Sequence, residues 1–373
     1  MPAHTLFECN GGQLDLRRFP EPRDYSLQAF NAADAYILDH IQSMNIKKGP
    51  IWVLNDAFGA LSLASSSLGS VWIGQSWSAR EALHRNAKIN GIAEVKTFWI
   101  DESDWGEAPS VVVMQIPKDL DLLQWQLRLL MERIPAGIPI VAGGMTRNIH
   151  TSTIKIFESY MTDVQSTIAI KKARLILATS KKPEKEELFK PQSYVDKATG
   201  LEIISYPGIF SADHPDPGSV LLAQKLPIFA PGTRVLDLGC GNGFLMTMVA
   251  YQSPGVIVSG TDDHILALRS AQATLERNGF EGDLYHGHAV ANIEEESVDV
   301  VVCNPPFHQD HARLDQIAFD MFAGSKKVLR TGGQLWVVGN RNLGYHIPLS
   351  RLFGKVEAVG SDPRYTVFKC TKR

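Results

Sequence analysis

The chain has 373 residues, of which 44% are hydrophobic and 21% charged, with 37 basic against 40 acidic residues and a formal net charge of −3. This length predicts two globular domains, and the charge excludes a strongly basic nucleic-acid-binding tail, although not a local basic patch. The cysteines form no CxxC pair and no histidine stands at metal-ligand spacing, so neither a disulfide framework nor a metal site is expected. Without a membrane-spanning apolar run, a signal-peptide pattern or any sign of oligomerisation, we expect a cytoplasmic protein.

The first half alternates short apolar runs with helical patterns. Buried strands are expected at 51–55, 71–74, 111–116 and 138–143, and helices at 78–91 and 120–134. Such alternation predicts parallel βαβ units and an α/β sheet covered on both faces.

Composition changes in the charged, proline-containing stretch 179–200, which has no apolar periodicity. We therefore expect a first domain at 1–182, a linker with a small hairpin at 183–203, and a second domain at 204–373.

The second half repeats the pattern, with strands expected at 234–239, 256–262, 298–304 and 333–340 and a helix at 265–279. Matching segments occur in the same order in both halves. The helical segments end in Asn90-Gly91 and Asn278-Gly279, and the strands VVVMQIPK and VVVCNPPF place Gln115 opposite Asn304. We interpret the chain as two tandem copies of one Rossmann-like domain.

The motif VLDLGCGNG joins an apolar strand to an expected helix. Asp237 comes first, and Gly239, Gly241 and Gly243 follow at alternate positions. Glycines in such places let the backbone turn sharply and approach a ligand closely. The dinucleotide fingerprint GxGxxG would need a glycine where Phe244 stands, which disfavours a nicotinamide oxidoreductase.

An acid, Asp262, ends the next expected strand, and Asp263 lies beside it, where we expect it to bind the cofactor near the edge of an adenine. A carboxylate accepts two hydrogen bonds at once, which suits the two hydroxyls of a ribose. After the third strand the chain offers His288 and Ala289 in place of an acid. These two are candidates for contact with an adenine, and an ordinary loop histidine is an equal interpretation.

The stretch VVCNPPFHQ carries the most specific chemistry. Asn304 combines an amide donor with a carbonyl acceptor, and Pro305 keeps its C=O without an N–H. Both oxygens can accept hydrogen bonds from one planar NH₂ group, and Phe307 can stack on a planar substrate. We expect these three residues to be catalytic by positioning, without a general base, with Pro306 and His308 beside them in the substrate pocket.

The stretch 205–227 precedes the glycine motif and contains GIFS, then Asp216-x-Gly218, then an apolar helical pattern. It predicts a segment that closes over the site, with Phe210 and Ser211 lining the substrate pocket. A plain loop leading into a helix is the alternative.

These motifs together resemble the bacterial ribosomal RNA guanine-N2 methyltransferases over nearly the whole chain. DLGCGNG is similar to the acid-x-G-x-G-x-G pattern of S-adenosylmethionine-dependent methyltransferases, and NPPF to that of enzymes that methylate adenine or guanine amines or glutamine amides. GIFS and GNRNLGY add to the resemblance, and LNDAFGAL, NIHTSTIKIFE and KKARLI favour the branch that acts on the large ribosomal subunit.

The resemblance implies two tandem class I methyltransferase domains, the first degenerate. It implies S-adenosyl-L-methionine as cofactor and methyl transfer to the exocyclic N2 of one guanine in 23S rRNA. The glycine loop would lie under the methionine portion, Asp237 would hold its ammonium, and Asp262 would bind the ribose. A 16S rRNA target, an adenine-N6 or glutamine-N5 target, and a non-catalytic RNA-binding assembly factor are the alternatives.

The first half lacks the chemical motifs. NDAFGAL (55–61) stands in place of DLGCGNG, which would put Leu61 in the place of the third glycine, where a cofactor methionine would clash. The ribose acid is missing, with Gln75 nearest, and QIPK replaces NPPF. We expect this half to bind the rRNA substrate, with a set of basic residues on phosphates or, equally, on a solvated face: Lys171, Lys172, Arg174, Lys181 and Lys182.

Overall fold

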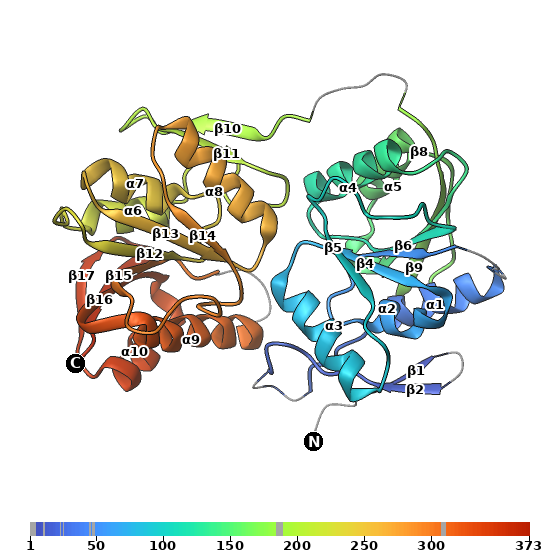
Figure 1. Cartoon of the computed structure of the whole chain (residues 1–373), viewed down its shortest axis with the longest axis horizontal. Helices are drawn as coiled ribbons and strands as arrows, with labels where there is room; N and C mark the ends of the chain where they lie inside the picture. Colours follow the sequence, from blue (N-terminus) through green and yellow to red (C-terminus); the bar gives the residue numbers. More distant parts are fainter. Residues whose placement is uncertain are drawn as a thin grey trace. The chain divides into compact units, whose positions relative to one another are not determined.

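The structure is a computed structural model that describes residues 5–9, 12–22, 24, 26–44, 46, 49–183, 189–306 and 311–373, without the side chains of 311–315. It divides into two compact units, Met1–Phe189 and Lys190–Arg373. Each unit contains one seven-stranded sheet with helices around it (Figure 1).

The first unit begins with a hairpin and continues with alternating strands and helices. Its sheet has the order β5-β4-β3-β6-β7-β9-β8, in which β9 runs antiparallel to its neighbours β7 and β8. The bounds are β1 Leu6–Cys9, β2 Gly12–Asp15, α1 Ala32–Ser43, β3 Ile51–Leu54, α2 Ala60–Ala64, β4 Ser70–Gly74, α3 Trp77–Ile89, β5 Lys96–Trp99, β6 Val111–Gln115, α4 Leu120–Arg133, β7 Pro139–Met145, α5 Thr151–Tyr160, β8 Met161–Ser166 and β9 Ala173–Ser180.

The second unit has the same sequence of elements. Its sheet order is β14-β13-β12-β15-β16-β18-β17, with β18 antiparallel to β16 and β17. The bounds are β10 Gln192–Val195, β11 Glu202–Ser205, α6 Pro217–Lys225, β12 Arg234–Leu238, α7 Phe244–Gln252, β13 Ile257–Asp262, α8 Ile265–Arg277, β14 Asp283–His286, β15 Val298–Cys303, α9 His311–Val328, β16 Leu329–Asn340, α10 His346–Phe353, β17 Val356–Ser361 and β18 Tyr365–Thr371.

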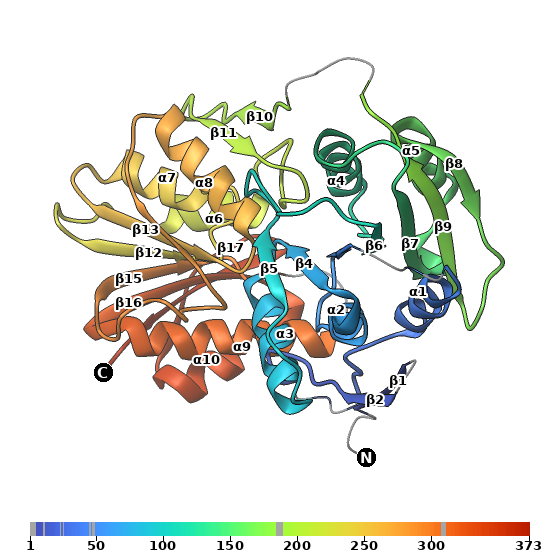
Figure 2. The same ribbon diagram turned by 45° about the vertical axis from the view of Figure 1, so that its right-hand side comes forward.

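Helices cover both faces of the sheet in the second unit. Helices α6, α7 and α8 contact one another on one face, and α9 and α10 contact each other on the other face (Figure 2). The central strand β15 is accordingly a nearly continuous apolar run, and Val301 and Val302 are fully buried. The strand order reverses between β12 and β15, which is where open α/β sheets bind ligands at the carboxyl ends of their strands.

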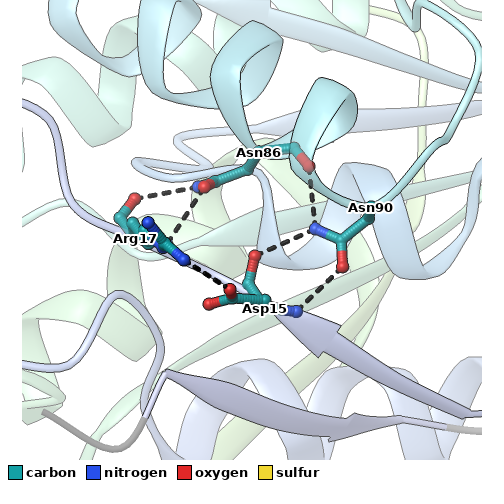
Figure 3. Close-up of polar contacts among 4 residues, drawn as sticks. All are labelled: Asp15, Arg17, Asn86 and Asn90. Atoms are coloured by element: carbon teal, nitrogen blue, oxygen red, sulfur yellow. Dashed lines mark hydrogen bonds and ion pairs between the residues drawn. The ribbon is translucent and has the colours of Figure 1, made fainter.

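The predicted duplication is confirmed by the identical strand orders, and it extends to the hairpins. In the first unit the Asn90 side chain donates to the Asp15 carbonyl at 2.9 Å and accepts from the Asp15 N–H at 2.8 Å (Figure 3). In the second unit Asn278 does the same with Glu202, at 2.8 and 3.0 Å. These are the asparagines of the two Asn-Gly pairs, so each ties a hairpin strand to the helix after the second sheet strand.

The expected parallel strands and helices of both halves are present at the expected positions. The antiparallel strands β8, β9, β17 and β18 were not anticipated. Strand β9 contains a largely buried apolar run, LILA, that was not anticipated. Strands β8, β17 and β18 have at most two buried residues each, whereas continuous apolar runs are typical of parallel strands buried on both faces. Strand β17, for example, has no fully buried residue.

Strand register fixes how the two halves correspond. Leu54 of β3 pairs with Met114 of β6, and Leu238 of β12 pairs with Cys303 of β15. Met114 directly precedes Gln115, and Cys303 directly precedes Asn304, the counterpart of Gln115. Leu54 therefore corresponds to Leu238.

This register corrects the alignment expected for the loops that follow. Gly59 now corresponds to Gly243, and each is the left-handed N-cap of the next helix, with φ of 86° and 78°. The expectation that Leu61 takes the place of the third glycine is therefore wrong. Leu61 lies inside α2, where it is fully buried.

Candidate active site

The glycine loop connects β12 to α7 at the point where the strand order reverses. Gly239, Gly241 and Gly243 all have left-handed backbone, with φ of 77°, 54° and 78°. A Cβ atom at Gly243 would lie 2.8 Å from the Cα of Ala271, whereas a Cβ at Gly241 would meet no atom within 4 Å. Gly243 is thus required by packing against α8, and Gly241 leaves the backbone open to a ligand.

The loop is held by the end of the neighbouring strand, β13. The N–H groups of Gly239 and Cys240 both donate to the Thr261 carbonyl, at 2.8 and 3.0 Å. The Gly241 N–H donates to Asp262 Oδ2 at 3.0 Å, and the His264 N–H donates to Asp262 Oδ1 at 2.9 Å. A carboxylate has about four acceptor positions, so Asp262 keeps acceptor capacity for two ligand hydroxyls.

Asp237 is buried beneath this loop, at 1% exposure. Its Oδ2 accepts from the Met246 N–H at 3.1 Å, and its buried Oδ1 has no hydrogen-bond partner among the described residues. Burial, together with the nearby Asp262, raises the pKa of Asp237 to about 7, and burial raises the pKa of Asp262 to about 6. A cationic group placed here would satisfy Oδ1 and favour the charged carboxylate.

The first unit fills the corresponding space with its own side chains. Its buried acid, Asp56, accepts from the N–H groups of Gly59 and Ser62 with separate oxygens, at 3.0 and 2.8 Å. The position of Asp262 is taken by Gly74, one residue before the expected Gln75, because β4 and β13 share their register. A Cβ at Gly74 would lie 2.2 Å from the buried ring of Trp72, so no acid fits there.

Amide side chains bond to one another at the carboxyl ends of the same strands. Asn55 donates to the Gln115 carbonyl at 2.8 Å and exchanges reciprocal hydrogen bonds with Gln126, at 2.9 and 2.8 Å. Gln75 donates to Asn55 at 3.2 Å. The first unit therefore satisfies internally most of the groups that would otherwise face a ligand; the buried Oε1 of Gln75 has no hydrogen-bond partner among the described residues.

Asn304 follows β15 and has its side chain fixed from one side. Its Nδ2 donates to Asp216 Oδ2 at 2.9 Å and to Ser219 Oγ at 2.7 Å, while its buried Oδ1 has no partner among the described residues. Asp216 is also the N-cap of α6, where it accepts from the Ser219 N–H at 2.7 Å. The corner therefore offers an amide oxygen as an acceptor.

The rest of the predicted corner is only partly described. Pro305 is buried and Pro306 is exposed. Phe307 and His308 lie outside the described residues.

The GIFS segment is connected to the glycine loop through a residue that the sequence analysis missed. Asn242 donates to the Ser211 carbonyl at 3.1 Å and to Ser205 Oγ at 3.2 Å. Ser211 has a φ of 57°, and Phe210 beside it is 55% exposed. The asparagine lies between two glycines of the motif, and only its polar side chain could have indicated a role for it.

The candidate adenine contacts, His288 and Ala289, follow β14, which pairs with β13. The Ala289 carbonyl accepts from Thr261 Oγ1 at 3.0 Å, and Ala289 has a φ of 48°. His288 Nε2 lies 3.2 Å from Asp320 Oδ2, and His286 Nε2 lies 2.9 Å from the Asp263 carbonyl. The fold thus brings these residues next to the acid that follows the glycine loop.

The basic residues expected to form one phosphate-binding cluster are separated. Lys171 and Lys172 form the turn before β9, and Lys181 and Lys182 follow its end. At about 3.3 Å per residue, the strand separates the two pairs by roughly 30 Å. The expectation of a single cluster is therefore wrong, because adjacency in sequence is not adjacency along an extended strand.

Two broader searches cover the part of the chain that the structure describes. No three His, Cys, Asp or Glu side chains gather there in a way that could hold a metal ion. No helix there is both long and apolar enough to cross a membrane.

Comparison with known proteins gives two matching domain families and close relatives. The RLMG N-terminal domain matches residues 4–183, and the methyltransferase small domain matches residues 200–369. "Ribosomal RNA large subunit methyltransferase G" of Streptomyces griseus is 36% identical over 98% of this chain and 99% of its own, and that of Streptomyces coelicolor is 37% identical over 97% and 98%.

A solved structure shares the fold over the whole length. The 16S rRNA N2 G1207 methyltransferase RsmC of T. thermophilus, in complex with AdoMet and guanosine, has a TM-score of 0.78 and 23% identity, and the match covers 99% of this chain and 98% of that one. Its two-domain architecture is the architecture described above.

Proposed function

The chain belongs to the ribosomal RNA large subunit methyltransferase G family, and from that premise we propose that it transfers a methyl group from S-adenosyl-L-methionine to the exocyclic N2 of one guanine in 23S rRNA. The second unit is the proposed catalytic domain. We also propose a cytoplasmic location, which ribosomal RNA as the proposed substrate supports.

The chemistry of the residues fits the proposed cofactor. The cofactor carries an ammonium, which suits the unpaired Oδ1 of Asp237, and a ribose, which suits the remaining acceptor positions of Asp262. The open space above Gly241 fits close approach of a ligand to backbone. When bound, the cofactor supplies a methyl group already activated by its sulfonium.

One observation carries the proposed reaction: the buried Oδ1 of Asn304 is an acceptor without a partner among the described residues. When a planar amine donates its N–H to this oxygen, its nitrogen lone pair lies roughly perpendicular to the N–H bond, so the hydrogen bond fixes the direction from which a methyl group can reach the nitrogen. The Pro305 carbonyl is the proposed second acceptor, and the absent N–H of proline removes a competing donor. Positioning is then the main contribution, and the target base must leave its stack to reach the corner.

A methyl-transfer assay tests the proposal. Unmodified 23S and 16S rRNA are incubated separately with the protein and cofactor labelled in the methyl group, and the modified nucleoside is identified by mass spectrometry. We expect N2-methylguanosine in 23S rRNA. The proposed reaction would be refuted if label appeared only in adenine or only in protein glutamine, or if no substrate were labelled.

The second candidate is the same chemistry on 16S rRNA. The structural neighbour, with which this chain shares its fold, is a 16S rRNA methyltransferase, and this likeness favours it. The higher identity to the large-subunit relatives supports the 23S target, and the two arms of the assay distinguish them.

We assign binding of the rRNA to the first unit, whose carboxyl-end space is filled by its own side chains. Support comes from arginines that are stacked on aromatic rings along α3. The guanidinium carbon of Arg85 lies 4.0 Å from the ring centre of Phe19, and that of Arg80 lies 4.9 Å from the ring centre of Trp99. Stacked guanidinium groups keep their charge and their planar donors, which suit phosphates and bases.

The segment that carries Phe19 is held on α3 by side-chain amides. Asn86 accepts from the Arg17 N–H at 3.0 Å and donates to the Arg17 carbonyl at 2.9 Å, one turn before the Asn90 contact (Figure 3). We name the surface formed by Arg17, Arg18, Arg80, Arg85 and Lys88 the α3 basic surface. Arg17 is paired with Asp15 and Arg85 with Glu81, and Glu21 also lies near Arg17; we propose this surface in place of the separated lysines.

A further inference from the structure

Resting on the proposed function, we propose that Asp216 and Ser219 are positioning residues that decide which atom of the Asn304 amide faces the substrate. An amide can be rotated by a half turn, which exchanges its oxygen for its NH₂ group. Only the orientation with the oxygen facing away from Asp216 can accept a hydrogen bond from an amine. The alternative would present N–H donors to N–H donors.

The charge of the partner selects the orientation. A carboxylate is an acceptor only, so Asp216 Oδ2, at 2.9 Å, must face the Nδ2 of Asn304. Ser219 Oγ accepts the other N–H of the same NH₂ group at 2.7 Å. Both donors are therefore used on the inner side, and the buried Oδ1, which has no partner among the described residues, is the acceptor that we assign to a substrate amine.

The backbone holds these two partners rigidly. Asp216 is the N-cap of α6, Pro217 follows at the first helical position, and the Asp216 carboxylate also accepts from the Ser219 N–H at 2.7 Å. Ser219 is thus positioned by the same oxygen that receives Asn304. A helix start with a proline and an internal cap has little freedom, so the amide is fixed before any substrate binds.

The first unit contains an equivalent contact without the proposed corner. Gln115, the counterpart of Asn304, donates its Nε2 to Asp34 Oδ1 at 2.5 Å. Asp34 is the third residue of α1, the position that Ser219 takes in α6, and it is joined to the N-cap Asn31 by a capping box, so an amide bonded to a helix start recurs, with the acid at a different cap position. The arrangement of the amide is therefore a feature of the duplicated domain that the second unit uses for its corner.

A reciprocal exchange of the two side chains tests the proposal. Asn304→Asp places two carboxylates at hydrogen-bond distance, and we expect methyl transfer at least about 100-fold below wild type. Combining it with Asp216→Asn restores one donor and one acceptor at the wild-type net charge, and the second oxygen of the introduced carboxylate again faces outward. We expect the double variant to return to within about 10-fold of wild type.

Asparagine is as good an N-cap as aspartate, so Asp216→Asn alone should change folding little. Ser219→Ala should lower kcat about 10-fold with an unchanged Kd for S-adenosylmethionine, and Ser219→Thr, which keeps the hydroxyl, should recover it.

Thermal unfolding tests the same contact independently of methyl transfer. Asn304→Asp should lower Tm by at least about 3 °C, and the double variant should recover it. Recovery of Tm without recovery of activity would overturn the positioning role, and recovery of neither would overturn the contact itself. A wild-type protein that methylates no RNA would refute the proposed function, whereas the Tm values would still decide the contact.

Discussion

Asp237 in the second unit and Asp56 in the first each accept a hydrogen bond from the third residue of the helix after the loop, Met246 and Ser62 respectively. They do so from different places in the chain, since Asp237 lies within β12 and Asp56 lies after the end of β3. Asp56 uses its second oxygen on Gly59, whereas the second oxygen of Asp237 has no partner among the described residues. In both units the acid thus accepts a hydrogen bond from the start of the next helix, but only Asp237 retains an oxygen that can bind a ligand.

Asp237 and Asp262 should lower the stability of the ligand-free protein as pH rises from about 4 to 7, against an opposite contribution from His264, whose pKa burial lowers to about 4. Burial raises the pKa of Asp237 from 3.8 to about 7 and that of Asp262 to about 6, so the folded state binds more protons than the unfolded chain in this window. Asp237→Asn should flatten the dependence, measured by urea unfolding at pH 5 to 8. The exposed Asp283→Asn is the control, and an unchanged slope in the Asp237 variant would contradict the prediction.

Binding of S-adenosylmethionine near pH 6.5 should release a proton. Asp237 is partly protonated at that pH in the ligand-free protein, and the cofactor ammonium favours its charged form. Calorimetry in two buffers of different ionisation enthalpy measures the release. Asp237→Asn should abolish it and weaken binding about 10- to 100-fold. Equal proton release by the variant would assign the titrating group elsewhere.

Alanine at two glycines should separate binding from folding. Gly243→Ala brings a Cβ to 2.8 Å from the Ala271 Cα, so we expect the free energy of unfolding to fall by several kcal/mol, about 3 or more. Gly241→Ala meets no atom within 4 Å, so it should cost only about 1 kcal/mol of backbone strain yet block the proposed cofactor. Urea unfolding and calorimetry measure the two effects. Normal cofactor affinity in Gly241→Ala would argue against a ligand over this loop.

Asn304→Ala should separate cofactor binding from methyl transfer. The Asn304 amide contacts Asp216 and Ser219 and leaves the glycine loop untouched, so the Kd for S-adenosylmethionine should stay within about 3-fold of wild type. Turnover should fall by about 100-fold or more, because the oriented acceptor is lost. Equal losses of binding and turnover would make the corner structural.

The α3 basic surface should determine RNA affinity and its salt dependence. Arg80→Gln and Arg85→Gln should each weaken binding to 23S rRNA and lower the salt slope of log K by about 1 if each neutralises one phosphate. Filter binding at several salt concentrations measures this. Lys369→Gln, which removes a cation from the Trp336 ring in the second unit, is a matched control. Unchanged slopes in both arginine variants would place the RNA elsewhere.

Much of the fold could be predicted because its signals are local. Parallel strands buried on both faces appear in the sequence as apolar runs, as in β15. Glycines indicate loop positions with positive φ, a conformation that other residues rarely adopt, as at Gly239 and Gly243. The antiparallel strands β8, β17 and β18 gave no such signal, whereas β9 carries an apolar run that was not anticipated.

The sequence by itself determined the duplication, the glycine loop and the amide after β15, since each depends on residue type and spacing within one segment. The tertiary structure decided the correspondence of the halves, because strand register shows that Gly59 corresponds to Gly243. It also showed that the lysines on either side of β9 lie at opposite ends of that strand. It also decided which atoms remain available. Whether Oδ1 or Nδ2 of Asn304 faces outward depends on Asp216, a residue far away in the chain, and hydrogen bonds between distant segments are set only when the chain has folded.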